Sequence, residues 1–246
     1  PAALVATASM FAAAALSLVG AGRMTEARRR GPLRDVPRQA WAGLTYVARH
    51  PTLRGLAIGL SVMNLASGLL IVALPLVVLE RLHANVAVVG ALWALSAASG
   101  GVCALVAGYR GSLGRERRML AEGGFASALA LAALAVAPDL AVVVPAMLLW
   151  GAAGGWTDIG MFSLRQRRTD PEWFGRAFAV SMSLNFAGSP LGSALAGPAL
   201  APGLGVGIGA GALVTLAGTA ILLRMVPVPA RKVGPPASPP PPPSLV

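Results

Sequence analysis

The chain has 246 residues, of which 56% are hydrophobic and only 12% are charged. Soluble domains carry about 25% charged residues, so these charges are too few to cover the surface of a soluble globular fold. The net charge of +11 would indicate a nucleic-acid partner in a soluble protein. Here the arginines lie in short clusters between apolar runs, without interleaved aromatic residues. We therefore expect a lipid bilayer, and no nucleic acid, as the partner.

About seven apolar stretches are long enough to cross a bilayer as helices, which takes about 20 residues. They lack the alternation of apolar and polar residues that is typical of membrane β-strands. The sequence therefore predicts an all-α, polytopic transmembrane helical bundle. In chain order, the predicted spans are residues 1–22, 55–79, 86–109, 119–137, 140–163, 177–200 and 204–223.

The basic residues are confined to alternate connections between these spans. Of the 20 Lys and Arg residues, all except Arg81 lie in segments 23–54, 110–118, 165–176 and 224–232. Basic residues accumulate in the cytoplasmic loops of membrane proteins. The pattern predicts an amino terminus outside and a carboxyl terminus in the cytoplasm.

Three further expectations concern the two ends of the chain and the connection after the first predicted span. The chain begins with Pro1 inside an apolar run whose positive charges follow it, the reverse of a signal peptide. We therefore expect the carboxyl-terminal piece of a longer membrane protein. Residues 33–49, which include Trp41 and Tyr46, predict an amphipathic helix on the inner leaflet. The proline-rich segment 225–246 predicts an extended, disordered tail.

Three stretches resemble the major facilitator superfamily, specifically its bacterial drug and siderophore exporters of the macrolide-efflux-like and enterobactin-exporter-like groups. GLTYVARHPTLR at 43–54 resembles the entry into the family's seventh helix, and LRQRRTDPEWFGRAFAV at 164–180 resembles its loop between helices ten and eleven. GRERR, formed by Gly114, Arg115, Glu116, Arg117 and Arg118, is similar to the second copy of the family's loop motif. The segment from residue 108 is one residue shorter than that motif and lacks its Asp.

This resemblance implies an organisation and a function. Residues 1–22 would be the last helix of an amino-terminal half, and 23–54 a basic cytoplasmic connector. Residues 55–224 would form the second six-helix half, and 225–246 the tail. The family implies a secondary transporter in a bacterial cytoplasmic membrane that exports small amphiphilic molecules by proton antiport. Its partners would be the substrate, protons and the missing amino-terminal half, and we expect no cofactor and no metal.

Ionisable groups inside a span are expensive and are candidates for function. Asp158 lies in the fifth predicted span, about five residues before the end of that span, where the cytoplasmic arginines begin. It could be a carboxylate that couples protons or binds a cationic substrate. The alternative is an ion pair with Arg165 or Arg176. Glu122 lies four residues after Arg118, which predicts an interfacial ion pair.

Uncharged polar and aromatic residues within spans are candidates for a substrate cavity. Asn64 and Ser67 are three residues apart and share one face of the second span, and Asn185 lies in the sixth. They could contact substrate or form interhelical hydrogen bonds. Trp150 and Trp156 lie inside the fifth span, where they could stack on a ligand or only pack.

Two other classes of function compete with the transporter. A seven-helix receptor or a non-transporting membrane scaffold fits the number of spans, but a retinal protein does not, because the single Lys232 lies in the tail. An enzyme is disfavoured because neither H-E-x-x-H nor G-x-S-x-G occurs. No Walker motif supports direct coupling to ATP.

Overall fold

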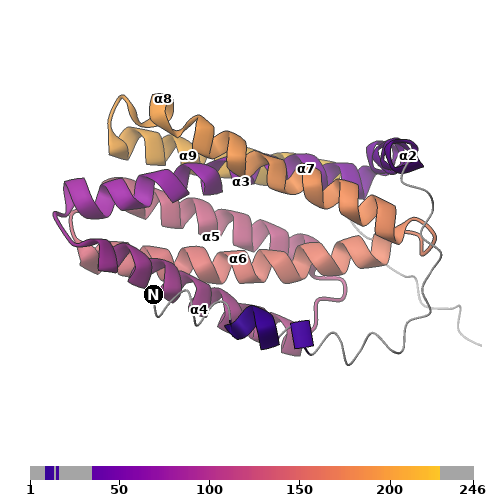
Figure 1. Cartoon of the computed structure of the whole chain (residues 1–246), viewed down its shortest axis with the longest axis horizontal. Helices are drawn as coiled ribbons and strands as arrows, with labels where there is room; N and C mark the ends of the chain where they lie inside the picture. The colour runs from indigo at the N-terminus through magenta and orange to yellow at the C-terminus, as the bar shows by residue number, and fades with distance from the viewer. Residues whose placement is uncertain (1–8, 14, 17–34, 228–246) are drawn as a thin grey trace, which may run out of the picture. The chain divides into compact units, whose positions relative to one another are not determined.

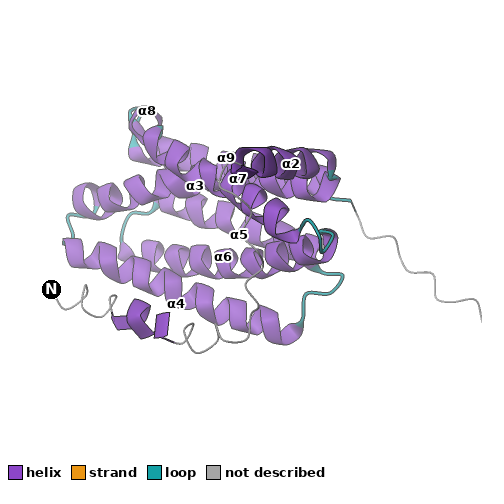
Figure 2. Ribbon diagram, turned by 45° about the vertical axis from the view of Figure 1, so that its right-hand side comes forward, coloured by secondary structure: helices purple, strands orange, loops and turns teal. Residues whose placement is uncertain are grey.

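The computed structural model describes residues 9–13, 15–16 and 35–227. These residues contain helices and connecting loops and no strand, so the predicted all-α fold is confirmed (Figure 2). Most of the predicted span 1–22 and nearly all of the predicted tail lie outside the described residues. The chain forms two compact units, 1–39 and 40–246. The packing below concerns the second unit.

Helices of membrane-spanning length make up the second unit (Figure 1). Five of the described helical segments are long and apolar enough to cross a membrane, and they coincide with five predicted spans to within a few residues at most ends. In chain order, the elements are α2 (Val36–Arg49), α3 (Pro51–Leu76), the π-helical turn η3 (Val77–Arg81), α4 (Val86–Arg110), α5 (Glu116–Val136), α6 (Leu140–Arg168), α7 (Phe174–Ala194), α8 (Ala196–Leu200) and α9 (Leu204–Met225).

The predicted continuous span 177–200 is wrong in one respect, because the helix is interrupted. Helix α7 ends at Ala194 and the short α8 begins at Ala196. Pro198 explains the break: it has no N–H to donate to the carbonyl of Ala194, and its ring crowds that carbonyl. Helix α7 also carries polar residues such as Asn185, and it is not among the five helices that are long and apolar enough to cross a membrane.

Helix α3 is central to the unit. It packs along α7 and along α9, α5 lies between α9 and α6, and α4 packs against α6 (Figure 1). Small residues allow these close contacts: a Cβ atom on Gly188 of α7 would collide with the carbonyl oxygen of Ser61 on α3, and one on Gly155 of α6 with that of Gly100 on α4. Close approach at glycines is the usual way in which helices associate in lipid, where no hydrophobic effect drives them together.

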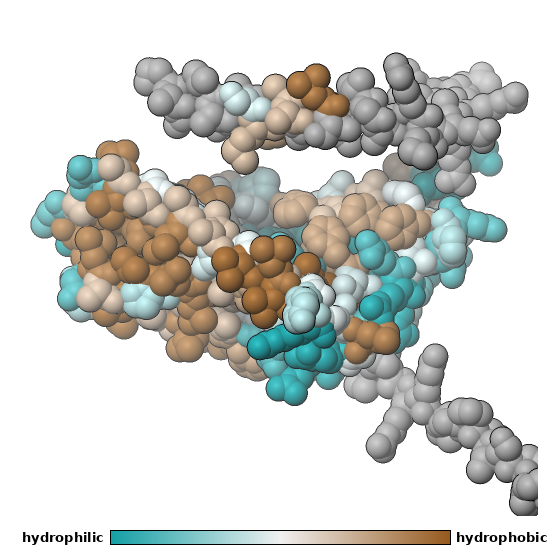
Figure 3. Space-filling model, turned by 90° about the horizontal axis from the view of Figure 1, so that it is seen from below, coloured by the Kyte–Doolittle hydropathy of each residue, from teal (hydrophilic) through white to brown (hydrophobic). Residues whose placement is uncertain are grey.

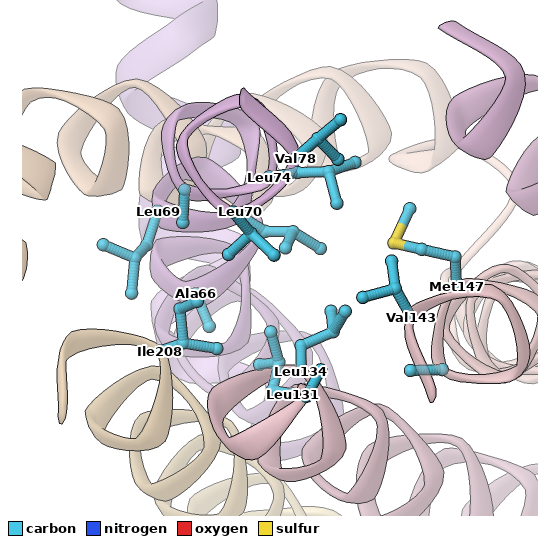
Figure 4. Packing of buried hydrophobic residues seen from close by; sticks show 14 of the residues in the cluster. Ala66, Leu69, Leu70, Leu74, Val78, Leu131, Leu134, Val143, Met147 and Ile208 are labelled. Carbon is cyan, nitrogen blue, oxygen red and sulfur yellow. The ribbon is translucent and has the colours of Figure 1, made fainter. Parts of the chain in front are cut away.

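Three apolar clusters are buried among the described residues of the unit, and the two larger ones lie at different depths. The larger one joins α3, α5, α6 and α9, and its side chains point toward one another in Figure 4, among them Leu70, Leu131 and Met147. The second cluster lies nearer the basic loops and includes Leu60, Met161 and Leu222. The polar side chains discussed below lie between these two clusters.

Polar side chains are concentrated at the ends of the helices. In Figure 3, hydrophilic residues occupy the two ends of the visible face and apolar residues cover the region between them. At the end opposite the basic loops, Arg81 donates hydrogen bonds to the carbonyl oxygens of Leu134 (3.3 Å) and Ala135 (3.1 Å). This isolated arginine thus satisfies carbonyl groups at the carboxyl end of α5.

Candidate functional site

A cavity of about 250 Å³ lies between α3, α5, α6, α7 and α9. Its lining residues lie near the middle of their helices, so the cavity lies near the middle of the bundle's depth. The polar and aromatic residues that line it are Asn64, Ser67, Ser127, Trp150, Thr157, Asp158, Asn185, Phe186 and Thr215. The structure therefore brings together five of the residues that the sequence singles out: Asn64, Ser67, Trp150, Asp158 and Asn185.

A second hollow, a groove of about 500 Å³, runs between α4 and α6. The cavity and the groove share Trp150, Gly154 and Asp158. Each of these residues follows the previous one by four positions, so they form one face of α6. A Cβ atom on Gly154 would have no neighbour within 4 Å, so this glycine leaves the passage between the two hollows open.

Asp158 lies deeper in the bundle than its sequence position indicates. Helix α6 continues to Arg168. Asp158 therefore lies about 15 Å from the end of this helix, measured along its axis. The side chain is exposed to the shared space. Among the described residues, none forms a hydrogen bond or an ion pair with it. A carboxylate at this depth without a partner is available to a proton or to a cation.

The ion pair considered for Asp158 with Arg165 or Arg176 is not present in the structure, where the described ion pairs are Arg118–Glu122 and Arg167–Glu116. Arg165 lies almost two helical turns further along α6 and contacts α7 instead, with its guanidinium 5.8 Å from the ring of Phe178. Arg176 lies over the ring of Trp173 at 5.6 Å. Neither arginine therefore pairs with Asp158 in the described structure.

Asn64 and Asn185 both line the cavity and also bond to each other. The Asn64 side-chain amide donates to the backbone oxygen of Asn185 (2.9 Å) and to its Oδ1 (3.0 Å). The Asn185 amide in turn contacts the sulfur of Met161 at 3.5 Å. The two uses proposed for these residues are therefore compatible, because the bond that joins α3 to α7 leaves both residues in the cavity wall.

The two tryptophans of α6 have different environments, and Trp156 is not among the residues that line the cavity. Trp150 lines the cavity, whereas Trp156 donates through Nε1 to Oε2 of Glu122 on α5 (2.9 Å). Trp156 is two residues from both Gly154 and Asp158, which turns it to the opposite side of the helix. Glu122 also accepts from Arg118 (2.6 Å), so the predicted pair is present and this carboxylate has two partners.

The GRERR segment connects α5 to its neighbours at the basic end. Gly114 has φ +75°, a backbone conformation that favours glycine. Arg115 lies 6.0 Å from the ring of Trp156, and Arg117 donates to the backbone oxygen of Leu223 on α9 (2.7 Å). The buried Glu116 pairs with Arg167 of α6 at 3.5 Å. These contacts join the ends of α5, α6 and α9.

Residues 40–49 of α2 are packed against the loop between α6 and α7. Tyr46 donates to Oδ2 of Asp170 (3.0 Å) and stacks on Trp173 with ring centres 5.0 Å apart. Burial raises the pKa of Tyr46, so the phenol keeps the proton that it donates. Burial also lowers the pKa of His50, against a smaller opposing effect of Asp170. The connector helix is therefore held by specific contacts at the basic end.

Sequence reasoning missed three polar residues of the cavity wall, Ser127, Thr157 and Thr215. Thr215 donates to the backbone of its own helix (2.9 Å), whereas the buried hydroxyl of Thr157 has no partner among the described residues. Their position near the middle of an apolar span is the sequence feature that could have identified these three residues. In the described part of the chain, no group of three or more His, Cys, Asp or Glu residues could hold a metal ion.

Comparisons with known proteins agree with this architecture. The sequence profile of the Major Facilitator Superfamily matches residues 1–193 and, a second time, residues 56–245. An uncharacterized MFS-type transporter of Sinorhizobium fredii (strain NBRC 101917 / NGR234), y4rN, is 43% identical over 162 residues. The match covers 65% of this chain but only 40% of that relative, so the chain spans less than half of its length. No solved structure matches the chain.

Proposed function

The chain belongs to the Major Facilitator Superfamily, a family of membrane transporters, and from this premise we propose that it is part of a proton-coupled exporter of small amphiphilic molecules. The observation that carries the proposal is the carboxylate of Asp158, which has no partner in the described part of the chain and belongs to the walls of both the central cavity and the α4–α6 groove. The position of the cavity near mid-depth is where transporters of this kind bind their substrates.

Proton antiport follows from the surroundings of Asp158. A carboxylate at membrane depth is costly while it is charged and unpaired, so it is stabilised by a proton or by a cationic group. A cationic substrate and a proton would therefore compete for the same oxygen atoms. Competition of this kind releases a proton when substrate binds and releases substrate when a proton returns, which is the elementary requirement for exchange.

The amphiphilic character of the substrate follows from the cavity wall. The amide and hydroxyl groups of Asn64, Ser67 and Thr157 lie in the same wall as the rings of Trp150 and Phe186. A ligand with one polar part and one apolar part would satisfy both kinds of surface, because aromatic rings attract apolar and cationic groups.

The topology proposed from the charge pattern makes the basic end cytoplasmic and the membrane the bacterial inner membrane. We assign residues 55–224 to the carboxyl-terminal half of the transporter, and 1–22 to the last helix of the preceding half. Substrate sites of this architecture lie between two halves. The isolated chain is therefore expected not to transport.

Efflux of a cationic dye such as ethidium from cells that express the complete transporter tests this proposal. Wild type, Asp158→Asn and Glu122→Gln are compared at equal membrane abundance, with and without a protonophore. We expect the protonophore to stop efflux by wild type, and Asp158→Asn to lower efflux at least about tenfold, an effect typical of losing a proton-transfer group. Glu122→Gln is the matched control, since this carboxylate is already paired, and should stay within about twofold of wild type.

Two results would contradict the proposal. Unchanged efflux by Asp158→Asn would remove this residue from coupling and leave coupling to another part of the transporter. If the wild-type protein moved no probe in cells or in vesicles, the assignment as an exporter would fail.

A further inference from the structure

The most deeply buried charge of the described bundle is that of Arg165. Its side chain is 0% exposed, and among the described residues its guanidinium has one hydrogen-bond partner, the sulfur of Met182 at Nη1, and one ring contact, with Phe178. The atoms Nε and Nη2 are buried and have no partner among the residues that the structure describes. Most of the donors of this group are therefore unused.

Such an arrangement is incomplete on physical grounds. A guanidinium stays charged under all ordinary conditions and offers five N–H donors in a planar fork. Thioether sulfur is only a weak acceptor, and a buried cation without a counter-anion is strongly unfavourable. An anionic group is needed at Nε and Nη2 to complete the site.

Arg165 lies one helical turn beyond the cavity wall. Met161 and Asn185 contact each other at the wall. Arg165 follows Met161 by four residues on α6, and Met182 precedes Asn185 by three residues on α7. The Arg165–Met182 contact is therefore the next layer toward the basic end. Flexible methionine side chains, which repack easily, separate the guanidinium from the cavity.

No acidic side chain of the described bundle forms an ion pair with Arg165. Glu116 pairs with Arg167, and Asp170 accepts the hydroxyl of Tyr46. Asp158 lies almost two turns away on the same helix. An anion that entered from the cavity would have to displace Met161 and Met182 to reach Arg165, and a planar carboxylate would match the geometry of the guanidinium fork.

We propose that Arg165 is a carboxylate-binding subsite at the basic end of the cavity, so that the substrates include organic acids with an apolar body. The inference rests on the proposed transport function and narrows its substrate class. Together with Asp158 in the cavity wall, the subsite would provide one negative and one positive group, seven residues apart, on the same face of α6.

The test measures binding of two probes that differ only in charge, 1-naphthoate and its neutral amide, 1-naphthamide, to the purified complete transporter in detergent. Tritiated 1-naphthoate is the labelled ligand and the amide competes with it. We expect wild type to bind the carboxylate at least about tenfold more tightly than the amide. Arg165→Gln should bind the two probes equally, and Arg165→Lys should keep part of the preference because it retains a point charge.

Arg176→Gln is the matched control, because this arginine is exposed and lies outside the cavity wall, and it should keep the wild-type preference. Equal binding of the two probes by wild type, no binding of 1-naphthoate, or an undiminished preference in Arg165→Gln would each overturn the proposal. If Arg165→Gln does not fold, binding of the two probes to wild type and to Arg165→Lys still tests the proposal. An Arg165 that serves only as the partner of an acidic side chain elsewhere in the transporter would give no probe preference.

The two proposals fail separately. Dye efflux that remains coupled to protons without a carboxylate preference would overturn the subsite alone. A carboxylate preference that depends on Arg165, in a protein whose efflux does not respond to a protonophore, would overturn proton coupling alone.

Discussion

The acidic residues of the bundle differ between its basic end and its centre. At the basic end, Glu116 pairs with Arg167, Glu122 with Arg118 and Trp156, and Asp170 with Tyr46. At the centre, Asp158 has no partner among the described residues. Paired charges hold helix ends together, whereas an unpaired charge at membrane depth has a cost that function has to justify. The partners of Glu116, Glu122 and Asp170 thus indicate structural roles, whereas Asp158 is the acidic residue of the centre that is a candidate for function.

The largest expected effect on stability concerns Gly154 and Gly155 of α6. Gly154 borders the central cavity, whereas Gly155 packs against α4. A Cβ atom on Gly155 would collide with the backbone of Gly100 on α4, whereas one on Gly154 would meet open space. Gly155→Ala should therefore destabilise the protein by about 1–3 kcal/mol or more. Gly154→Ala, the matched control, should be neutral or slightly stabilising, because alanine favours helices. Thermal unfolding in detergent measures both, and equal effects would contradict the packing described.

The difference between Glu116 and Asp158 can be tested by neutralising each carboxylate and measuring the stability of the protein. Glu116→Gln should lower the free energy of unfolding by about 1–2 kcal/mol, because a buried carboxylate loses its ionic partner. Asp158→Asn should leave it unchanged or raise it, because no pair is lost. Chemical or thermal unfolding in detergent checks both variants. A loss of stability in Asp158→Asn as large as that in Glu116→Gln would show that Asp158 has a structural partner.

A smaller effect is expected where α2 meets the α6–α7 loop. Tyr46→Phe removes the hydroxyl that bonds to Asp170 but keeps the ring that stacks on Trp173. We expect the docking of residues 40–49 to weaken by about 1 kcal/mol. Hydrogen exchange of this helix should become faster, with that of α9 unchanged. Val47→Ala, at a residue buried against Leu53 and Ala177, serves as a control for simple loss of apolar contact. Unaltered exchange in Tyr46→Phe would show that stacking alone holds the helix.

The smallest expected effect is a pH dependence of the same contact. Burial lowers the pKa of His50 below its ordinary value, with Arg168 acting in the same direction and Asp170 opposing. A free histidine therefore binds more protons than the docked one, and docking loses stability as the pH falls below the ordinary histidine pKa, about 6.5. Hydrogen exchange of residues 40–49 should be faster at pH 5.5 than at pH 8, and His50→Gln should remove most of this difference. A pH response that survives in His50→Gln would assign it to another group.

The sequence by itself determined the fold class, the positions of five membrane helices and the alternation of basic loops. These properties are local, because the thickness of the bilayer sets the length of each apolar run and the charge rule acts on each loop separately. Even the break before α8 has a local cause, Pro198. The pair Arg118–Glu122 was predictable for the same reason, since four residues along one helix bring two side chains together.

The tertiary structure alone decided which polar residues share a site. Asn64, Asp158 and Asn185 meet because glycines let α3 and α7 approach closely and because α6 presents one face to them. The rotation of that helix places Trp150 in the cavity wall and Trp156 against Glu122 of α5. Among the described residues, it leaves both Asp158 and Arg165 without the ion pair that their spacing allowed. Rotation and close approach depend on contacts between distant segments, and no single apolar run contains that information.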